Sequence, residues 1–197
     1  MKKIALAATM ALVLSGGVAK ADWIDYWGFG GGATQSPDLD FNGTDREMQL
    51  GYNMGAFVGW SQTEDVSIMA DFMFSESEYE GSASSLQSLS VMLNAMYVLD
   101  TGDFWRPYLG VGAGAVEVNF DRGTTNPTGG GVFLPGSIGS GSEWAFGYQA
   151  LAGMSFAVDE THAITLGYRY QMSEDVTITG RNVEYATHSL SIGVVFN

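Results

Sequence analysis

The sequence contains no cysteine and only two histidines among its 197 residues. Without cysteine the chain forms no disulfide and no thiolate metal site, so its stability has to come from backbone pairing and side-chain packing. Two histidines also restrict the enzymatic options, because imidazole is the most frequent general acid and base in catalysis.

Positive charge is scarce as well. Eight Lys and Arg residues stand against 22 Asp and Glu, which gives a formal net charge of −14, and the last lysine is Lys20. A nucleic-acid interface needs a cluster of Lys and Arg that neutralises phosphates. The sequence has no such cluster, which excludes nucleic acid as a partner.

Long apolar runs are missing too, since nowhere do the roughly 20 consecutive apolar residues of a transmembrane helix occur. The apolar stretch 4–14 follows two lysines and precedes the small-residue sequence Ala19-Lys20-Ala21. This order is typical of a secretory signal peptide. We expect residues 1–21 to be removed on export by the Sec route. A single domain, residues 22–197, would remain with a net charge of about −17, because three lysines leave with the signal.

Alternation of apolar with small or polar residues is what the sequence has in abundance. Near the C-terminus the apolar residues from Leu190 to Phe196 alternate with the small residues from Ser189 to Gly193. Alternation with a period of two is typical of a strand that has one apolar face. Turn signals divide the chain into eight such runs, at residues 23–34, 47–61, 66–79, 87–98, 107–120, 143–158, 162–172 and 185–196.

The connections between these runs alternate in length. Three are short, at residues 62–65, 99–106 and 159–161, and three are long, at 35–46, 121–142 and 173–184. Short periplasmic turns and longer external loops are characteristic of bacterial outer-membrane barrels. The sequence therefore predicts an all-β fold, an eight-stranded antiparallel up-and-down transmembrane β-barrel.

Alternation alone does not decide which face points outward, because a soluble ligand carrier turns its apolar face inward. The apolar faces hold more bulky side chains than the interior of a small barrel accommodates. Aromatic residues recur near the strand ends, as in interfacial girdles. Asp71 and Arg169 fall on the small or polar face, and an arginine exposed to mid-bilayer lipid would cost about 2–4 kcal/mol. We therefore expect lipid on the outside.

Three segments carry a family resemblance: residues 106–115, residues 146–156 leading into 162–170, and residues 185–196. In these segments the chain resembles the small eight-stranded outer-membrane β-barrels, which include opacity-type and porin-like surface antigens and the OmpA-type membrane domain. The resemblance implies the outer membrane of a Gram-negative bacterium as location. It implies outer-membrane lipids, lipopolysaccharide and the barrel-insertion machinery as partners. Members serve as adhesins, structural proteins, antigens and narrow pores, so the fold does not specify an activity.

The resemblance also suggests a role for Phe196. Members of the family usually end in an aromatic residue, which resembles an address read by the barrel-insertion machinery. Here Phe196 is penultimate and Asn197 follows. We expect Phe196 to act as the periplasmic sorting end, with a somewhat weaker signal.

Catalysis would have to involve a histidine. Some lipid-A hydrolases on similar barrels pair a histidine with a serine in a His-x-Ser arrangement. In this chain Ser189 follows His188 directly, so the two side chains of one strand point to opposite faces. We expect no catalysis and no cofactor, with His188 near the outer rim and His162 at the periplasmic interface.

Arg169 is the strongest functional candidate inside the barrel, because a buried guanidinium needs carboxylate partners. Asp71, on the corresponding face of the third run, and Asp25, in the first, are its candidate partners. A salt-bridge cluster of these residues would plug the lumen. We favour a permanent plug, and the alternative is a gate whose rearrangement opens a small pore.

The first long connection contains half of a calcium-loop pattern. Asp38, Asp40 and Asn42 match its first positions, but the charged Asp45 stands where an apolar residue is usual, and Gln49 stands where the bidentate glutamate is expected. We favour a solvated acidic loop with an Asn-Gly turn and no metal. The remaining alternative is calcium that bridges these carboxylates to lipopolysaccharide phosphates.

The connection 121–142 is rich in Gly, Ser and Thr and includes the apolar sequence Val132-Phe133-Leu134. Such a loop can contact a host surface or the membrane, or fold over the barrel mouth. Our leading interpretation is a monomeric barrel with a structural or surface-interaction role, adhesin- or antigen-like, that binds a host or cell-surface ligand. The alternatives are a narrow passive channel for small solutes and, from a different class, a lipid-A-modifying enzyme.

Overall fold

A computed structural model describes residues 24–36, 39–41, 44–46, 49–78, 85–121, 141–174, 176–178, 181–183 and 185–197. The expected signal peptide, residues 1–21, lies outside the described residues. No helix in the described part is long and apolar enough to cross a membrane.

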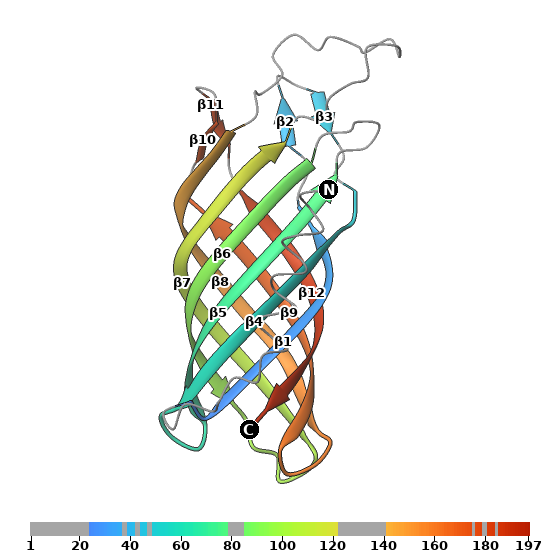
Figure 1. The fold of residues 1–197 in the computed structure, drawn as a ribbon, viewed down its shortest axis with the longest axis vertical. Coiled ribbons are helices and arrows are strands. Elements are labelled where there is room, and N and C mark those ends of the chain that lie inside the picture. The colour runs from blue at the N-terminus through green and yellow to red at the C-terminus, as the bar shows by residue number, and fades with distance from the viewer. Residues whose placement is uncertain are drawn as a thin grey trace, which may run out of the picture.

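Eight long strands close into one barrel, with the strands steeply tilted against its axis (Figure 1). Each strand pairs antiparallel with its neighbours, and β1 closes the barrel by pairing with both β4 and β12. The predicted fold class is therefore confirmed. The eight strands are β1 (Tyr26–Gln35), β4 (Gly51–Ser61), β5 (Val66–Glu78), β6 (Ser85–Val98), β7 (Trp105–Asp121), β8 (Gly141–Ala157), β9 (His162–Ser173) and β12 (Ala186–Phe196).

All eight observed strands overlap the predicted runs, but two features of the connections were not expected. Two small hairpins, β2 (Leu39–Phe41) with β3 (Thr44–Arg46) and β10 (Val176–Ile178) with β11 (Arg181–Val183), form inside long connections. Both lie at the same end of the barrel, which we call the long-loop end (Figure 1). The C-terminus lies at the opposite, short-turn end, which in outer-membrane barrels faces the periplasm.

The outward faces form an apolar band of about the height that a membrane requires. On β7 the outward residues run from Trp105 to Ala115 without a charge, and Glu117 follows at the long-loop end. Ten residues at about 3.3 Å each, tilted by about 40°, rise about 25 Å, which matches the band height of outer-membrane barrels. Large apolar side chains in this band are 41–66% exposed, namely Val91, Leu93, Leu109, Val111, Leu166, Leu190 and Ile192.

Bulky side chains in the lumen lie over glycines of the neighbouring strands. The Tyr26 ring lies against Gly59, and the Phe57 ring lies against Gly28. The Tyr108 side chain lies against both Gly153 and Gly167. A Cβ atom at each of these glycines would collide with the ring. The lumen is therefore less polar than the sequence pattern suggests, because glycine on one strand makes room for a large residue on the next.

The short turns are held by side-chain hydrogen bonds to the backbone. In the turn between β8 and β9, Asp159 Oδ1 accepts hydrogen bonds from the Thr161 N–H at 2.8 Å and the His162 N–H at 2.9 Å. The Thr161 N–H, followed by the His162 and Thr161 side chains, holds the pKa of Asp159 well below its usual range. This turn therefore relies on an ionised carboxylate.

Candidate functional site in the barrel lumen

The centre of the lumen contains a buried ion pair between strands on opposite sides of the barrel. Arg169 Nη1 on β9 donates to Asp71 Oδ1 on β5 at 2.8 Å, and their side chains are 16% and 3% exposed. The two residues are brought together as the sequence suggested, because both occupy lumen-facing positions at similar depth. A pair this well buried is costly to desolvate and needs further hydrogen bonds to satisfy its remaining atoms.

Two amide side chains supply those hydrogen bonds. Asp71 Oδ2 accepts from Asn94 Nδ2 at 2.5 Å and from Gln149 Nε2 at 3.0 Å. Gln149 Nε2 also donates to Asn94 Oδ1 at 2.5 Å, and Gln149 Oε1 accepts from Arg169 Nη1 at 3.1 Å and from Gln171 Nε2 at 3.2 Å. Each amide thus donates through nitrogen and accepts through oxygen, which sets its orientation.

A hydroxyl chain extends this network toward the long-loop end. The Tyr185 hydroxyl donates to Ser88 Oγ at 2.7 Å, and Ser88 Oγ lies 2.7 Å from Ser75 Oγ. Beside this chain, Val118 pairs with Ser88 and Val116 with Ser90, and both valines are completely buried in the lumen. Hydrogen-bonded polar side chains and packed apolar side chains thus occupy the middle of the lumen.

The amides and Tyr185 were not singled out as site residues from the sequence. A signal for them exists, because Asn94, Gln149 and Gln171 are polar residues in the middle of strands, on the same face as Asp71 and Arg169. Tyr185 gives no such signal, since an aromatic residue near a strand end suggests a girdle. Tyr185 directly precedes β12. It points inward because it lies two residues before Thr187 and four before Ser189, which face the lumen.

Asp25 does not join the cluster, which corrects the expectation that it is a partner of Arg169. It precedes β1 at the short-turn end and is exposed. Its Oδ2 accepts the backbone N–H of Ser61 at 2.6 Å. The first strand begins at Tyr26, so Asp25 lies too far along the barrel axis to reach the middle of the lumen.

His188 and Ser189 lie on opposite faces of β12. His188 is exposed on the outside, 2.7 Å from the Tyr168 hydroxyl and stacked on Tyr170 at 4.6 Å between ring centroids. Ser189 is buried in the lumen, 2.9 Å from Thr34 Oγ1. The two side chains therefore cannot act together as base and nucleophile.

Phe196 lies on the outer surface at the short-turn end. Its ring stacks on Trp27 at 4.4 Å and meets the His162 ring edge-on at 5.2 Å, so it is part of an aromatic cluster where β1, β12 and β9 meet. His162 Nδ1 also lies 2.8 Å from Asp159 Oδ1. An aromatic cluster at this height matches the interfacial girdles of barrels.

Only part of the candidate calcium loop lies within the described residues. Asp38 and Asn42 lie outside the described residues, and Asp40 and Asp45 face each other in the β2–β3 hairpin, where only the backbone is described. Among the side chains that the structure describes, no group of three or more His, Asp or Glu is arranged to hold a metal ion.

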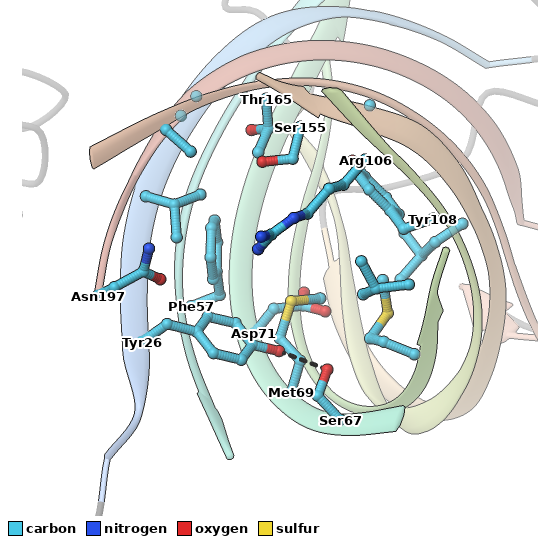
Figure 2. A pocket seen from close by; sticks show the side chains of 18 of the residues that line it. Tyr26, Phe57, Ser67, Met69, Asp71, Arg106, Tyr108, Ser155, Thr165 and Asn197 are labelled. Atoms are coloured by element: carbon cyan, nitrogen blue, oxygen red, sulfur yellow. Dashed lines mark hydrogen bonds between the residues drawn. The ribbon is translucent and has the colours of Figure 1, made fainter. Parts of the chain in front are cut away.

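A cavity of about 460 Å³ enters the barrel from the short-turn end and reaches Asp71 and Arg169. We call it the lower cavity; Figure 2 shows its walls. Met69, Met96 and Leu151 form a buried cluster in the wall, and three aromatic residues, Tyr26, Phe57 and Tyr108, pack against that cluster. The Tyr26 hydroxyl and Ser67 Oγ are 2.9 Å apart, which pins the Tyr26 ring against the wall.

Comparison with known proteins agrees with this architecture. Residues 4–197 match the family model of the outer membrane protein beta-barrel domain. A search of curated proteins by sequence gave no match.

Solved structures with a similar fold include three bacterial proteins. Neisserial surface protein A (NspA) is 18% identical with a TM-score of 0.64, over 87% of this chain and 95% of that chain. Ail, the attachment invasion locus protein of Yersinia pestis, is 14% identical with a TM-score of 0.49, over 87% and 97%. The outer membrane protein OprG from Pseudomonas aeruginosa is 13% identical with a TM-score of 0.48, over 87% and 96%. At these identities the likeness concerns the fold alone.

Proposed function

The chain belongs to the outer membrane protein β-barrel domain family, and we propose that it is a closed, non-conducting barrel with a structural and surface-interaction role at the long-loop end. The observation that carries this proposal is the hydrogen-bonded layer around Asp71 and Arg169. Members of such families differ in activity, so the lumen and the ends of this barrel, and not the fold, indicate its function.

The layer closes the lumen because its polar groups already satisfy one another. The carboxylate of Asp71 accepts three hydrogen bonds, from Arg169, Asn94 and Gln149. A passing ion or solute would have to replace these bonds within a low-dielectric interior, at the cost of leaving a buried charge unpaired. A permanent plug therefore accounts for the layer better than an open pore.

The surface-interaction role is supported by the strands that continue past the apolar band. β7 and β8 have 17 residues each, the longest of the barrel, and pair up to Phe120 and Gly141. A membrane strand needs only about 9–11 residues. The ladder between β7 and β8 thus continues past the apolar band up to Phe120 and Gly141, and the connection between these two strands would meet a host or cell-surface ligand.

Export, membrane insertion and oligomeric state are proposed from the sequence. The absence of enzymatic activity is proposed from the surroundings of His188. The protein would reach the membrane through the Sec route, be inserted by the barrel-insertion machinery and remain a monomer in contact with lipopolysaccharide. It would have no enzymatic activity, because the His188 ring contacts Tyr168 and Tyr170 among the described residues, while Ser189 lies on the opposite face.

Conductance in planar lipid bilayers tests the closed lumen. We expect no current steps from the wild type, while a general porin prepared in the same way serves as positive control. The variant Arg169→Ala should also stay silent, because Asn94, Gln149 and Gln171 still occupy the lumen. Current from the wild type, or current that appears in the variant, would favour the second candidate, a narrow channel gated by Arg169. The lower cavity, which reaches Arg169 from one side, is the feature that favours that candidate.

Cell adhesion tests the surface role. A strain that expresses the protein should bind host cells better than a strain in which residues 122–140 are replaced by a short Asn-Gly turn. Heat-modifiable migration in detergent gels would verify that the shortened barrel still folds. Equal binding by the two strains, with both barrels folded, would contradict a role for this connection.

A further inference from the structure

We propose that the lower cavity binds a small monocarboxylate with an aromatic or short aliphatic body, which enters from the periplasmic side. This inference goes beyond the proposed function and does not depend on whether the lumen conducts. It rests on the size of the cavity, on hydroxyl groups in its wall that have no partner within the described part of the chain, and on an arginine at its mouth.

The cavity has the size and the lining of a small-molecule site. Its volume of about 460 Å³ falls within the roughly 300–1,000 Å³ that is usual for ligand pockets. Met69, Met96 and Leu151 are at most 9% exposed and provide an apolar wall, and Phe57 packs against this cluster, in edge contact with Tyr26 at 6.4 Å. The bulk of a bound molecule would therefore contact methyl, thioether and ring surfaces.

Three polar groups in the same wall lack a hydrogen-bond partner among the described residues. The hydroxyls of Tyr108, Ser155 and Thr165 line the cavity and form no hydrogen bond with any residue that the structure describes. Ser155 and Thr165 lie side by side because they are paired across β8 and β9. Hydroxyls inside an otherwise apolar chamber orient a ligand that carries hydrogen-bonding atoms.

Arg106 supplies the charge that selects a carboxylate. It occupies a lumen-facing position at the start of β7, and its side chain extends across the cavity (Figure 2). Its nearest carboxylate is Asp100, with Nε 3.8 Å from Oδ1 and both side chains more than half exposed, so the pair is loose. A planar guanidinium in this state can bind a carboxylate through two parallel hydrogen bonds.

The rim limits the charge that the ligand can carry. Glu64, Asp65, Asp159 and Glu160, all in the short turns, line the mouth together with Arg106. These carboxylates repel a dianion such as a phosphate monoester more strongly than they repel a single negative charge. A monocarboxylate with an apolar body satisfies the arginine, the hydroxyls and the apolar wall together.

Methionine-methyl NMR tests the proposal, because the methionines report on different places. The protein, labelled with 13C in its methionine methyl groups and held in lipid nanodiscs, would be titrated with 3-phenylpropanoate. We expect saturable shifts for Met69 and Met96. Met92, which is 1% exposed and is not among the residues that line the lower cavity, and the outward-facing Met154 serve as internal controls and should not shift.

Analogues and variants separate this site from non-specific uptake. The neutral 3-phenylpropanamide should bind about ten-fold more weakly than the acid, since it forms no charge-assisted pair with Arg106. Arg106→Gln should weaken binding of the acid to the level of the amide, and Leu151→Trp, which fills the chamber, should abolish it. Heat-modifiable migration would show that each variant is folded.

Three results would overturn the proposal. The first is the absence of a saturable shift, and the second is an equal shift of the outward-facing Met154, which means partition into the bilayer. The third is tighter binding of the cation 3-phenylpropylamine than of the acid, which would mean that the acidic rim, and not Arg106, selects the ligand.

Discussion

Replacing Arg169 by methionine should lower the free energy of unfolding by about 3–5 kcal/mol, the usual cost of removing one partner from a buried ion pair. The variant loses the 2.8 Å bond to Asp71 and the 3.1 Å bond to Gln149. The Asp71 carboxylate, with its side chain 3% exposed, stays buried without its counter-charge. Because Asn94 and Gln149 still donate to Oδ2, the loss should not exceed this range.

Chemical unfolding in phospholipid vesicles, followed by tryptophan fluorescence, measures this change. Arg106→Met is the matched control, since its pair with Asp100 is exposed and should contribute less than about 1 kcal/mol. In the double variant Asp71→Asn/Arg169→Met no charge remains, so at least half of the lost stability should return. A loss below 1 kcal/mol in Arg169→Met, or a double variant as unstable as the sum of the single ones, would refute a structural role of the ion pair.

Three further predictions concern the membrane face, the C-terminal end and a short turn. Val111→Arg, in the middle of the apolar band, should destabilise the barrel by about 2–4 kcal/mol in vesicles, and unchanged stability would argue against lipid contact at Val111. Phe196→Ala should lower the yield of folded protein in outer membranes more than Leu190→Ala does, whereas equal yields would count against a sorting role. Asp159 has a lowered pKa in the folded state, so the stability it contributes is present above its usual value of 3.8 and is lost as the pH falls below it. The advantage of the wild type over Asp159→Asn in unfolding experiments should therefore be constant near neutral pH and vanish in acid, and an advantage that persists in acid would contradict this assignment.

The strands could be predicted because each carries its own alternation, which does not depend on the partner strand. β5, β6 and β9 begin or end within two residues of the predicted runs for this reason. The meeting of Asp71 with Arg169 could also be anticipated, since both are charged residues on the polar face in mid-strand. The physical cost of a charge in lipid leaves the lumen as their only place.

The rest of the lumen could not be predicted, because it depends on which residues face each other across strands. Met92 and Val116 are large apolar residues on a face that the pattern suggests to be small or polar, and both are buried. They fit because Met92 lies over Gly114 and Val116 over Gly147. Such pairs follow from the register between strands, which a single sequence does not contain. The amide orientations around Asp71 depend on the same register.

The placement of glycines under bulky neighbours has a consequence for how this barrel can evolve. A side chain can be gained at Gly59 only if Tyr26 shrinks or moves, because the Tyr26 ring fills that space, whereas at Gly28 the Val194 backbone oxygen adds to the Phe57 ring as an obstacle. Related sequences should accordingly exchange volume between adjacent strands while the sum over each pair stays nearly constant. Lumen-facing residues would then change in pairs, with a gain of volume at one position matched by a loss at the other. Lipid-facing residues would be free to change one at a time.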